Sequence, residues 1–271
     1  MNRMIFGDGK VSKIIRNEND IIINHSQCDI TNYDDVNNII KKTTSDVIIN
    51  AVAKTNLEYC QINKLEAYRV NVIGTKNLLI SCAENNKKFL HISSGCLFDG
   101  NDKIIHEASS ASPAVWYTWT KLWADQFIEN YGYEKYLILR PRQLISSVEH
   151  PTNMLTKFMK MPAIAAIDEQ NSLTCIEDLA AMINHLLAFD ARGIYNCANS
   201  GTVSPYWMAM ELKNTISPLM NVSKISYSDF LLTLKNKRVN TILSTDKLEK
   251  TGYKNRSAEE AVHWCIKNYK K

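Results

Sequence analysis

A tyrosine and a lysine four residues apart are the clearest candidates for chemistry in this chain. Tyr117 and Lys121 share one face of a helix if residues 117–130 are helical, as their pattern predicts. A phenol has a pKa of about 10, and a nearby lysine cation favours the phenolate. Such a phenol could protonate a carbonyl oxygen while hydride reaches the carbonyl carbon. Ser94, expected at a strand end, could hydrogen-bond the same oxygen.

A thiol follows two residues after that serine, in the run His91-Ile-Ser-Ser-Gly-Cys-Leu-Phe-Asp-Gly100. If the chain is still extended at Ser94, Cys96 points to the same side, because strand side chains alternate. A thiol with a pKa of about 8.5 can remove and return a proton beside a keto group, which inverts that carbon. From residue type alone, an inert buried cysteine is the simpler interpretation.

A glycine-rich turn follows the first expected strand. Gly7-Asp-Gly9-Lys-Val-Ser12 could let backbone amides approach a pyrophosphate at a helix N-terminus. Ser12 stands where the G-x-G-x-x-G pattern has its third glycine, which predicts slightly looser helix–strand packing. Taken alone, the turn is more simply explained as an ordinary β–α connection, and the other signals reverse that preference.

The second expected strand ends in Asn24-His25-Ser26, without the acidic residue that NAD-selective sites prefer. This favours NADPH over NADH, with Lys10 or His25 near the 2′-phosphate. Asp29 is a candidate for the adenine amino group, and a role as a turn or helix-cap residue is an equal alternative. The residues expected to bind the cofactor are Gly7, Gly9, Lys10, Val11, Asp29, Ile30, Ala51, Ala53, Tyr117 and Lys121.

Alternating strands and helices must position these residues. The expected strands are 3–6, 21–23, 46–51, 89–92 and 136–139. The expected helices are 11–16, 33–43, 64–85 and 117–130. This alternation predicts a parallel sheet with helices on both faces, whose ligands bind at the carboxyl ends of the strands. Gly7, Ala51, Ser94 and Arg140 would then lie along one rim.

Two domains are expected. Residues 1–145 form an α/β domain, a Rossmann-type doubly wound parallel sheet that binds NADP(H). Residues 146–271 form a smaller, mixed α/β C-terminal substrate domain with helices at 205–216, 228–235 and 258–269. Helix 176–189 and strand 193–197 are expected to rejoin the first domain.

The composition excludes several classes of protein. The net charge of +4 contains no Lys/Arg block, so no nucleic-acid partner is expected. The seven cysteines are scattered without C-x-x-C or Cys/His metal spacing, which indicates reduced thiols and no metal site. No apolar run reaches about 20 residues, and the N-terminus enters a strand directly, so a cytoplasmic protein without membrane contact is expected.

The chain resembles extended short-chain dehydrogenases/reductases of the dTDP-4-dehydrorhamnose reductase group. The stretches that carry the resemblance are Asp46-Val-Ile-Ile-Asn-Ala51, Leu57-Glu-Tyr-Cys60, Asn71, residues 94–100, Tyr117 with Lys121, and Arg238-Val-Asn-Thr-Ile-Leu243. Residues 94–98, 139–147 and 151–157 are closer still to plant-type UDP-4-keto-6-deoxyglucose 3,5-epimerase/4-reductases. The shorter glycine loop with Ser12 departs from the family pattern.

The resemblance implies further site residues. Cys96 and Lys157 match the family's epimerisation pair. Asn153, Arg238 and Asn240 match positions facing the nucleotide-sugar. Arg142, like Arg140, could reach the phosphate or the sugar, or could instead pin the domain interface.

Three functions remain in competition. The preferred one is a bifunctional 3,5-epimerase/4-keto-reductase that makes UDP-L-rhamnose from UDP-4-keto-6-deoxy-D-glucose with NADPH. The nearer alternative is a reductase alone, acting on a dTDP- or UDP-linked keto-sugar, amino-sugars included. The third is a non-catalytic nucleotide-binding regulatory subunit. The family also implies a homodimer. The sequence around His91, His106 and His263 shows no pattern that pairs these histidines with other functional side chains.

Overall fold

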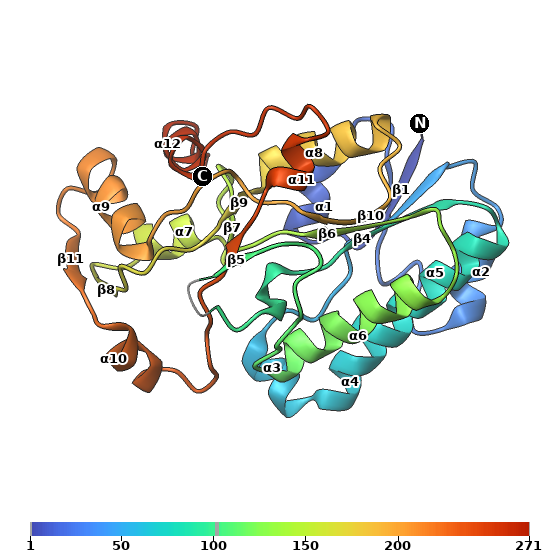
Figure 1. The fold of residues 1–271 in the computed structure, drawn as a ribbon, viewed down its shortest axis with the longest axis horizontal. Coiled ribbons are helices and arrows are strands. Elements are labelled where there is room, and N and C mark those ends of the chain that lie inside the picture. The colour runs from blue at the N-terminus through green and yellow to red at the C-terminus, as the bar shows by residue number, and fades with distance from the viewer. Residues whose placement is uncertain (1, 101–102, 271) are drawn as a thin grey trace.

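The computed structural model describes residues 2–100 and 103–270, and its centre is a six-stranded sheet (Figure 1). The strand order is β10-β6-β4-β3-β1-β2, and every pairing within it is parallel. The strands are β1 (Arg3–Phe6), β2 (Ile21–Ile23), β3 (Val47–Asn50), β4 (Lys88–Ile92), β6 (Tyr136–Arg140) and β10 (Gly193–Asn196). The predicted α/β fold class is confirmed.

Helices cover both faces of this sheet because successive strand residues point to opposite sides. On one face, α1 (Lys10–Ile15) and α8 (Ile176–Ala188) pack over Ile5, Ile49 and Leu90. On the other, α2 (Tyr33–Ile40), α5 (Gly74–Glu84) and α6 (Trp116–Asn130) pack over Ile48 and Phe89. Figure 1 shows the two helical layers above and below the sheet.

The helix expected over residues 64–85 is interrupted. The chain forms α4 (Lys64–Tyr68), a π-helical turn at Arg69–Ile73 and then α5. Inside that turn, the buried side chain of Asn71 forms hydrogen bonds with the backbone of Lys54 and the hydroxyl of Thr120. The π-helical turn thus connects the loop after β3 with α6 through one side-chain amide. A further helix, α3 (Leu57–Ile62), lies in a stretch for which no element was predicted.

A second core lies beside the sheet, at the left of Figure 1. We call it the substrate-side core: the buried cluster that includes Leu155, Ile164, Met208, Leu212 and Val262. Its elements are α7 (Met154–Met159), α9 (Pro205–Thr215), α12 (Ala258–Lys267), and the strand pairs β8 (Ala163–Ala166) with β11 (Asn221–Lys224) and β7 (Leu144–Ile145) with β9 (Thr174–Cys175). The remaining elements are β5 (Ile104–Ile105), β12 (Ile242–Leu243), α10 (Tyr227–Leu232) and α11 (Asp246–Glu249).

The order of the strands creates a crevice at one rim. The chain leaves β1 through α1 to reach β2 on one side, then returns through α2 to β3 on the other side. Ligands of doubly wound sheets bind at such a switch point, outside the carboxyl ends of the strands. Gly7 and Ala51 follow β1 and β3 there. Among the described residues, no helix has the length and apolar character needed to cross a membrane.

Candidate active site

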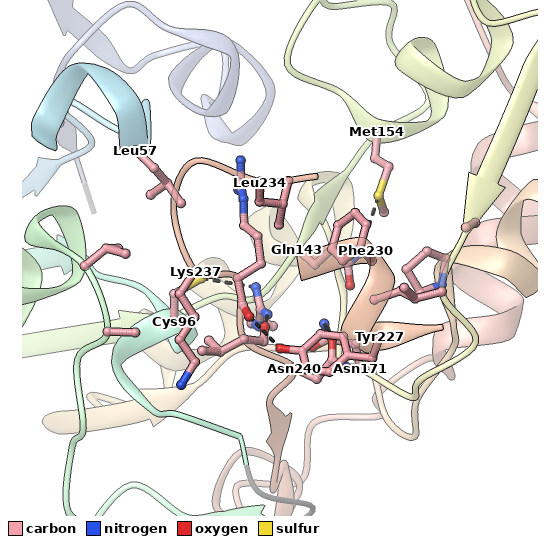
Figure 2. Close-up of a pocket in the computed structure, with 18 of the residues that line it drawn as sticks. Leu57, Cys96, Gln143, Met154, Asn171, Tyr227, Phe230, Leu234, Lys237 and Asn240 are labelled. Carbon is pink, nitrogen blue, oxygen red and sulfur yellow. Dashed lines mark hydrogen bonds between the residues drawn. The ribbon is translucent and has the colours of Figure 1, made fainter. Parts of the chain in front are cut away.

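A cavity of about 460 Å³ opens between the rim of the sheet and the substrate-side core. Cys96, Tyr117 and Arg142 line one wall of it. Figure 2 shows Tyr227 and Phe230 among the side chains drawn around the same space. The cavity therefore brings predicted catalytic residues together with segments from the C-terminal half of the chain.

Ser94 and Tyr117 occupy the positions that the sequence predicts. Ser94 is extended just beyond β4, and its Oγ accepts a hydrogen bond from Cys96 N at 3.1 Å. Tyr117 lies in the first turn of α6 and is 9% exposed. Burial raises the pKa of the Tyr117 phenol above its ordinary value, a charge on Cys96 raises it further, and a hydrogen bond from Ser94 lowers it.

Lys121 lies in the interior of the protein, one helical turn after Tyr117. Its Nζ donates to the carbonyl oxygen of Ile92 at 2.8 Å and lies 3.1 Å from Nε2 of His91. Burial lowers the pKa of Lys121 from 10.5 to about 8, and Asp125 opposes that shift. Burial therefore works against charge on both Tyr117 and Lys121, and so against the phenolate that a lysine cation would favour.

Arg140 belongs to a buried ion pair rather than to the cavity. Its Nε donates to Oδ2 of Asp125 at 3.1 Å, and its Nη1 donates to the carbonyl oxygen of Glu107 at 3.0 Å. Asp125 is on α6, one turn after Lys121. The pair thus fixes α6 against β6, which is a structural role for Arg140.

Cys96 reaches the cavity by a route other than the one predicted. Residues Gly95–Leu97 form a short 3₁₀ helix, so the alternation of an extended strand does not apply. The half-buried Sγ accepts a hydrogen bond from Nη1 of Arg142 at 3.1 Å, drawn as a dashed line in Figure 2. A second guanidinium nitrogen, Nη2, donates to the carbonyl oxygen of Val239, while Nε is buried without a partner among the described residues. Arg142 thus presents a cation to the thiol.

Lys157 is not among the residues that line the cavity. It is exposed on α7, whose neighbouring residues Met154 and Phe158 do line the cavity. The charge of Lys157 acts instead on Lys10. The pKa of Lys10 is lowered to about 8, mainly because the residue is buried and secondly because the Lys157 cation repels its charge. Lys157 therefore lies between the cavity and the glycine-rich turn.

The predicted substrate contacts divide into two groups. Arg142, Arg238 and Asn240 line the cavity, and Asn171 Nδ2 donates to Asn240 Oδ1 at 3.1 Å (Figure 2). Asn153 does not line it: its side chain caps α7 and donates to the carbonyl oxygens of residues 146 and 148 at 2.8 and 2.9 Å. The prediction for Asn153 is corrected, because every polar atom of that side chain is already bonded within the fold.

Several residues that line the cavity were not predicted to belong to the site. They are Gln143, Asn171, Tyr227, Phe230, Leu234 and Lys237. Gln143 is the most unusual, since it is a non-glycine residue at φ 45° whose buried Oε1 has no partner among residues 2–100 and 103–270. Only the folded chain places these distant segments around one space.

The turn after β1 has the geometry of a phosphate-binding loop. Gly7 has φ 105°, and a Cβ there would lie 3.2 Å from the backbone of Ala51, so the two strand ends meet at this glycine. Gly9 caps α1 with open space around it, and the first amides of α1 have no helical partner. Ser12 is fully buried, and its Oγ has no partner in the described part of the chain. Lys10 and Val11 are half-buried at the same helix start, and Ala53 is half-buried in the loop after β3.

Asp29 and Ile30 lie in the loop between β2 and α2. The Oδ1 atom of Asp29 accepts from the amide and the hydroxyl of Thr31 at 2.9 and 2.8 Å, and the pKa of Asp29 is lowered mainly by the amide bond. This is the turn role that was the alternative for Asp29. Ile30 is buried, and its side chain fills the space above Gly74.

Three residues with metal-ligating atoms do converge elsewhere, although the spacing along the chain gave no sign of it. Ligand atoms of Cys175, Glu177 and Cys265 lie within 4.8 Å of one another. The two sulfurs are 3.5 Å apart, and Cys175 Sγ is 3.2 Å from Glu177 Oε2, distances that suit a chain of thiol hydrogen bonds ending at a carboxylate. A guanidinium nitrogen of Arg256 lies 3.8 Å from Cys175 Sγ and would repel a metal cation there.

The chain is similar to known proteins over most of its length. Residues 10–271 match the RmlD substrate binding domain. The chain belongs to this family. A relative from Arabidopsis thaliana, a bifunctional dTDP-4-dehydrorhamnose 3,5-epimerase/dTDP-4-dehydrorhamnose reductase, is 26% identical over 214 residues, covering 74% of this chain and 70% of that protein. The chain spans only 32% of the length of a trifunctional relative from the same plant.

Two solved structures resemble the whole of this RmlD family member. The dTDP-4-dehydrorhamnose reductase of Bacillus anthracis, solved in complex with NADP, superposes with a TM-score of 0.88 at 22% identity over 98% of both chains. The L780 UDP-rhamnose synthase of Acanthamoeba polyphaga mimivirus superposes with a TM-score of 0.87 at 20% identity over 99% of both chains. These likenesses confirm the fold.

Proposed function

We propose that this protein is an NADPH-dependent reductase of nucleotide-linked 4-keto-6-deoxysugars. The observation that carries the proposal is Tyr117, which lines a cavity of about 460 Å³, forms a hydrogen bond with Ser94 and lies one helical turn before the buried Lys121. Membership of the RmlD substrate binding domain family and the NADP complex of the Bacillus anthracis enzyme support it.

The residues present fit a dinucleotide. Gly7 and Gly9 leave the backbone amides of the α1 start accessible to a pyrophosphate, and Lys10 adds a cation there. The buried, unpartnered Oγ of Ser12 lies under the same turn. No acidic residue stands in the run Asn24-His25-Ser26 directly after β2, which leaves room for a 2′-phosphate and makes NADPH the first choice and NADH the second. When bound, the nicotinamide supplies the hydride.

The protein's own side chains handle the proton. Tyr117 donates its phenolic proton to the C4 oxygen of the sugar, and Ser94 donates a hydrogen bond to the same oxygen. The raised pKa of the Tyr117 phenol keeps the proton on the tyrosine until the keto oxygen gains charge. Lys121, with a pKa of about 8, can then replenish that proton near neutral pH.

The finer proposal is that the same cavity also epimerises C3 and C5, so that UDP-4-keto-6-deoxy-D-glucose becomes UDP-L-rhamnose. Cys96 lines the cavity beside Tyr117, and the guanidinium of Arg142 donates to its sulfur at 3.1 Å. A guanidinium in that position can pair with a thiolate, which is the form that removes a proton. Lys157 is proposed as the partner acid, and the bifunctional plant relative supports the pairing of activities.

The reductase proposal is tested with a keto-sugar that has already been epimerised. We expect NADPH oxidation by the wild-type protein and a loss of about 10²–10⁴-fold in kcat/KM for Tyr117→Phe, which removes only the acidic proton. An unchanged rate in Tyr117→Phe would contradict the proposal. It would favour the alternative of a non-catalytic nucleotide-binding regulatory subunit, which the intact Ser94, Tyr117 and Lys121 set otherwise opposes.

The epimerase proposal is tested with un-epimerised UDP-4-keto-6-deoxyglucose. We expect UDP-L-rhamnose from the wild type, and no epimerisation from Cys96→Ser although pre-epimerised substrate is still reduced. Cys82→Ala is the matched control, since Cys82 is a buried thiol in α5 away from the cavity. Lys157→Met is compared with Lys160→Met, which changes an exposed lysine on the same helix end.

A reductase without epimerase activity is the second candidate, acting on a dTDP- or UDP-linked sugar. The exposed position of Lys157, outside the residues that line the cavity, favours it. Normal conversion of un-epimerised substrate by Lys157→Met would assign the acid to another residue. Formation of product only from pre-epimerised substrate would instead establish the simple reductase.

We also propose a homodimer in the cytoplasm. The apolar side chains of Ile62, Leu65 and Trp119 are exposed on α3, α4 and α6, which contact one another. Light scattering of the wild type and of Ile62→Glu/Leu65→Glu tests this surface. A monomeric wild type would reject the dimer.

A further inference from the structure

His91 is a fully buried, titratable residue at the centre of the sheet. It sits on β4 with no exposed surface, and its ring lies between Lys121 on one side and Asn50 on the other. The distances are 3.1 Å from Nε2 to Lys121 Nζ and 3.2 Å from Nδ1 to the side-chain amide nitrogen of Asn50. Which ring nitrogen holds the proton is therefore decided by these two partners.

The orientation of the Asn50 amide is fixed by its other bonds. Its Oδ1 accepts from the backbone amide of Val52 at 3.0 Å, so the nitrogen must face the other way. The hydroxyl of Thr75 donates to the carbonyl oxygen of Asn71 at 2.7 Å, and its oxygen therefore accepts from Asn50 Nδ2 at 3.0 Å. One hydrogen of that nitrogen remains, and it points at His91 Nδ1.

The chain of donors continues through the imidazole. Because Nδ1 accepts from Asn50, it carries no proton, and a neutral His91 must hold its proton on Nε2. That proton faces Lys121 Nζ, which already donates to the carbonyl oxygen of Ile92. An ammonium group has three donors and no acceptor, so only the uncharged amine of Lys121 can accept from Nε2.

We infer that His91 is a positioning residue that donates its Nε2 proton to Lys121 and thereby favours the uncharged amine in the reductase site. If Lys121 were charged, Nε2 of His91 would have to be unprotonated in order to accept from it. The proton of the neutral His91 ring would then lie on Nδ1, where it would face the amide hydrogens of Asn50. Two donors would then face each other in the protein interior, which is costly.

The other charged and titratable groups around Lys121 act differently. Asp125, on the same helix, favours the cation but is itself paired with Arg140 of β6. Tyr117, one turn earlier on the helix, is buried as the neutral phenol. His91 is thus the group on β4 that opposes the charge. The pKa of His91 lies well below its ordinary value, chiefly through burial, and agrees with a neutral ring.

This inference rests on the proposed reductase function for its consequence. A lysine whose amine and ammonium forms are close in free energy near neutral pH can both give and take a proton. His91 would thus set the pH at which Lys121 can resupply Tyr117, without touching substrate or cofactor.

A stability measurement tests the inference without any assay of activity. The pKa of Lys121 is about 8 in the folded protein and 10.5 ordinarily, so between these values the unfolded chain holds a proton that the folded chain lacks. The stability of the wild type therefore gains from Lys121 as pH rises through this window. In His91→Gln, the amide oxygen of the glutamine can accept from the ammonium of Lys121. The gain in stability therefore begins at a higher pH in this variant than in the wild type.

The expected result is a destabilisation of His91→Gln that grows between pH 7 and pH 10. For each pH unit by which the variant raises the titration of Lys121, the ratio of the two unfolding constants changes by about tenfold. The control is Phe89→Leu, which alters packing on the same face of β4, where the Phe89 ring stacks with His91 at 6.3 Å. Its cost should not vary over this range. A constant cost for His91→Gln would overturn the inference.

The reductase assay gives a second reading. Because the charged lysine is the form that resupplies the proton, kcat/KM for pre-epimerised substrate should fall as pH rises past about 8 in the wild type. The falling limb should lie about one pH unit higher in His91→Gln, and an unmoved limb would also overturn the inference. Absence of any reductase activity in the wild type would reject the proposed function, while the stability comparison would still decide the role of His91.

Discussion

Removing the charge of Asp125 should destabilise the protein strongly, because it leaves Arg140 buried without its counter-ion. Asp125 has no exposed surface and Arg140 is 4% exposed, with 3.1 Å between Nε and Oδ2. At an effective dielectric of about 20, two charges roughly 4 Å apart attract by about 4 kcal/mol. Breaking a buried pair by removing one partner typically costs about 3–5 kcal/mol. We therefore expect Asp125→Asn to lose about 3 kcal/mol or more, since the new amide still accepts one hydrogen bond.

The assay is urea unfolding at pH 7, followed by circular dichroism. The decisive comparison is the double variant Asp125→Leu/Arg140→Met, which replaces both charges by apolar groups of similar size. Such replacements are often neutral or stabilising, so the double variant should be more stable than Asp125→Asn. A cost below about 0.5 kcal/mol for Asp125→Asn would refute the reasoning, since it would mean that the Arg140 charge is solvated in the folded state.

Two further outcomes follow from other contacts. Asn71→Leu should cost about 1–3 kcal/mol in urea unfolding, because it leaves the amide of Lys54 without a partner and removes one bond each from the Lys54 carbonyl and the Thr120 hydroxyl. A near-neutral effect would mean that water replaces the Asn71 amide. NADPH binding, followed by cofactor fluorescence, should weaken as pH rises past about 8, because Lys10 loses its charge there. In Lys157→Met the affinity should fall at a higher pH, because the charge of Lys157 disfavours the Lys10 cation. Affinity that does not vary between pH 7 and 9 would exclude Lys10 from the phosphate site.

The sheet was the most predictable part of the molecule. Its strands are short, buried on both faces and nearly all apolar. A strand such as 46–51 can therefore be predicted from its own residues, without knowledge of the strands it pairs with. The expected strand starts and ends agree with the structure within a residue or two. The helix expected over 64–85 was less accurate, because the π-helical turn at Asn71 depends on bonds to Lys54 and Thr120, which are distant along the chain.

Residue patterns alone predicted the candidate site only where its chemistry is local in sequence, whereas Arg238 and Asn240 came from the family resemblance. Tyr117 and Lys121 lie one helical turn apart, so their spacing carries the information. The prediction for Cys96 assumed that the backbone is extended at Ser94–Cys96, whereas residues 95–97 form a 3₁₀ helix. The cation that contacts Cys96 belongs to Arg142, which is 46 residues away along the chain. His91 showed no partner pattern because Lys121 and Asn50 are 30 and 41 residues distant.

The composition of the substrate-side core has a consequence for how the chain folds during synthesis. The sheet is complete once β10 has emerged, at residue 196, but the substrate-side core also needs α9 and α12, and α12 begins at Ala258. A ribosome-bound chain can therefore hold a finished nucleotide-type sheet while Leu155 and Ile164 still lack the helices that cover them. Such intermediates expose apolar surface and are the species that chaperones bind. The interval between residues 196 and 258 is thus when this protein is most prone to aggregate.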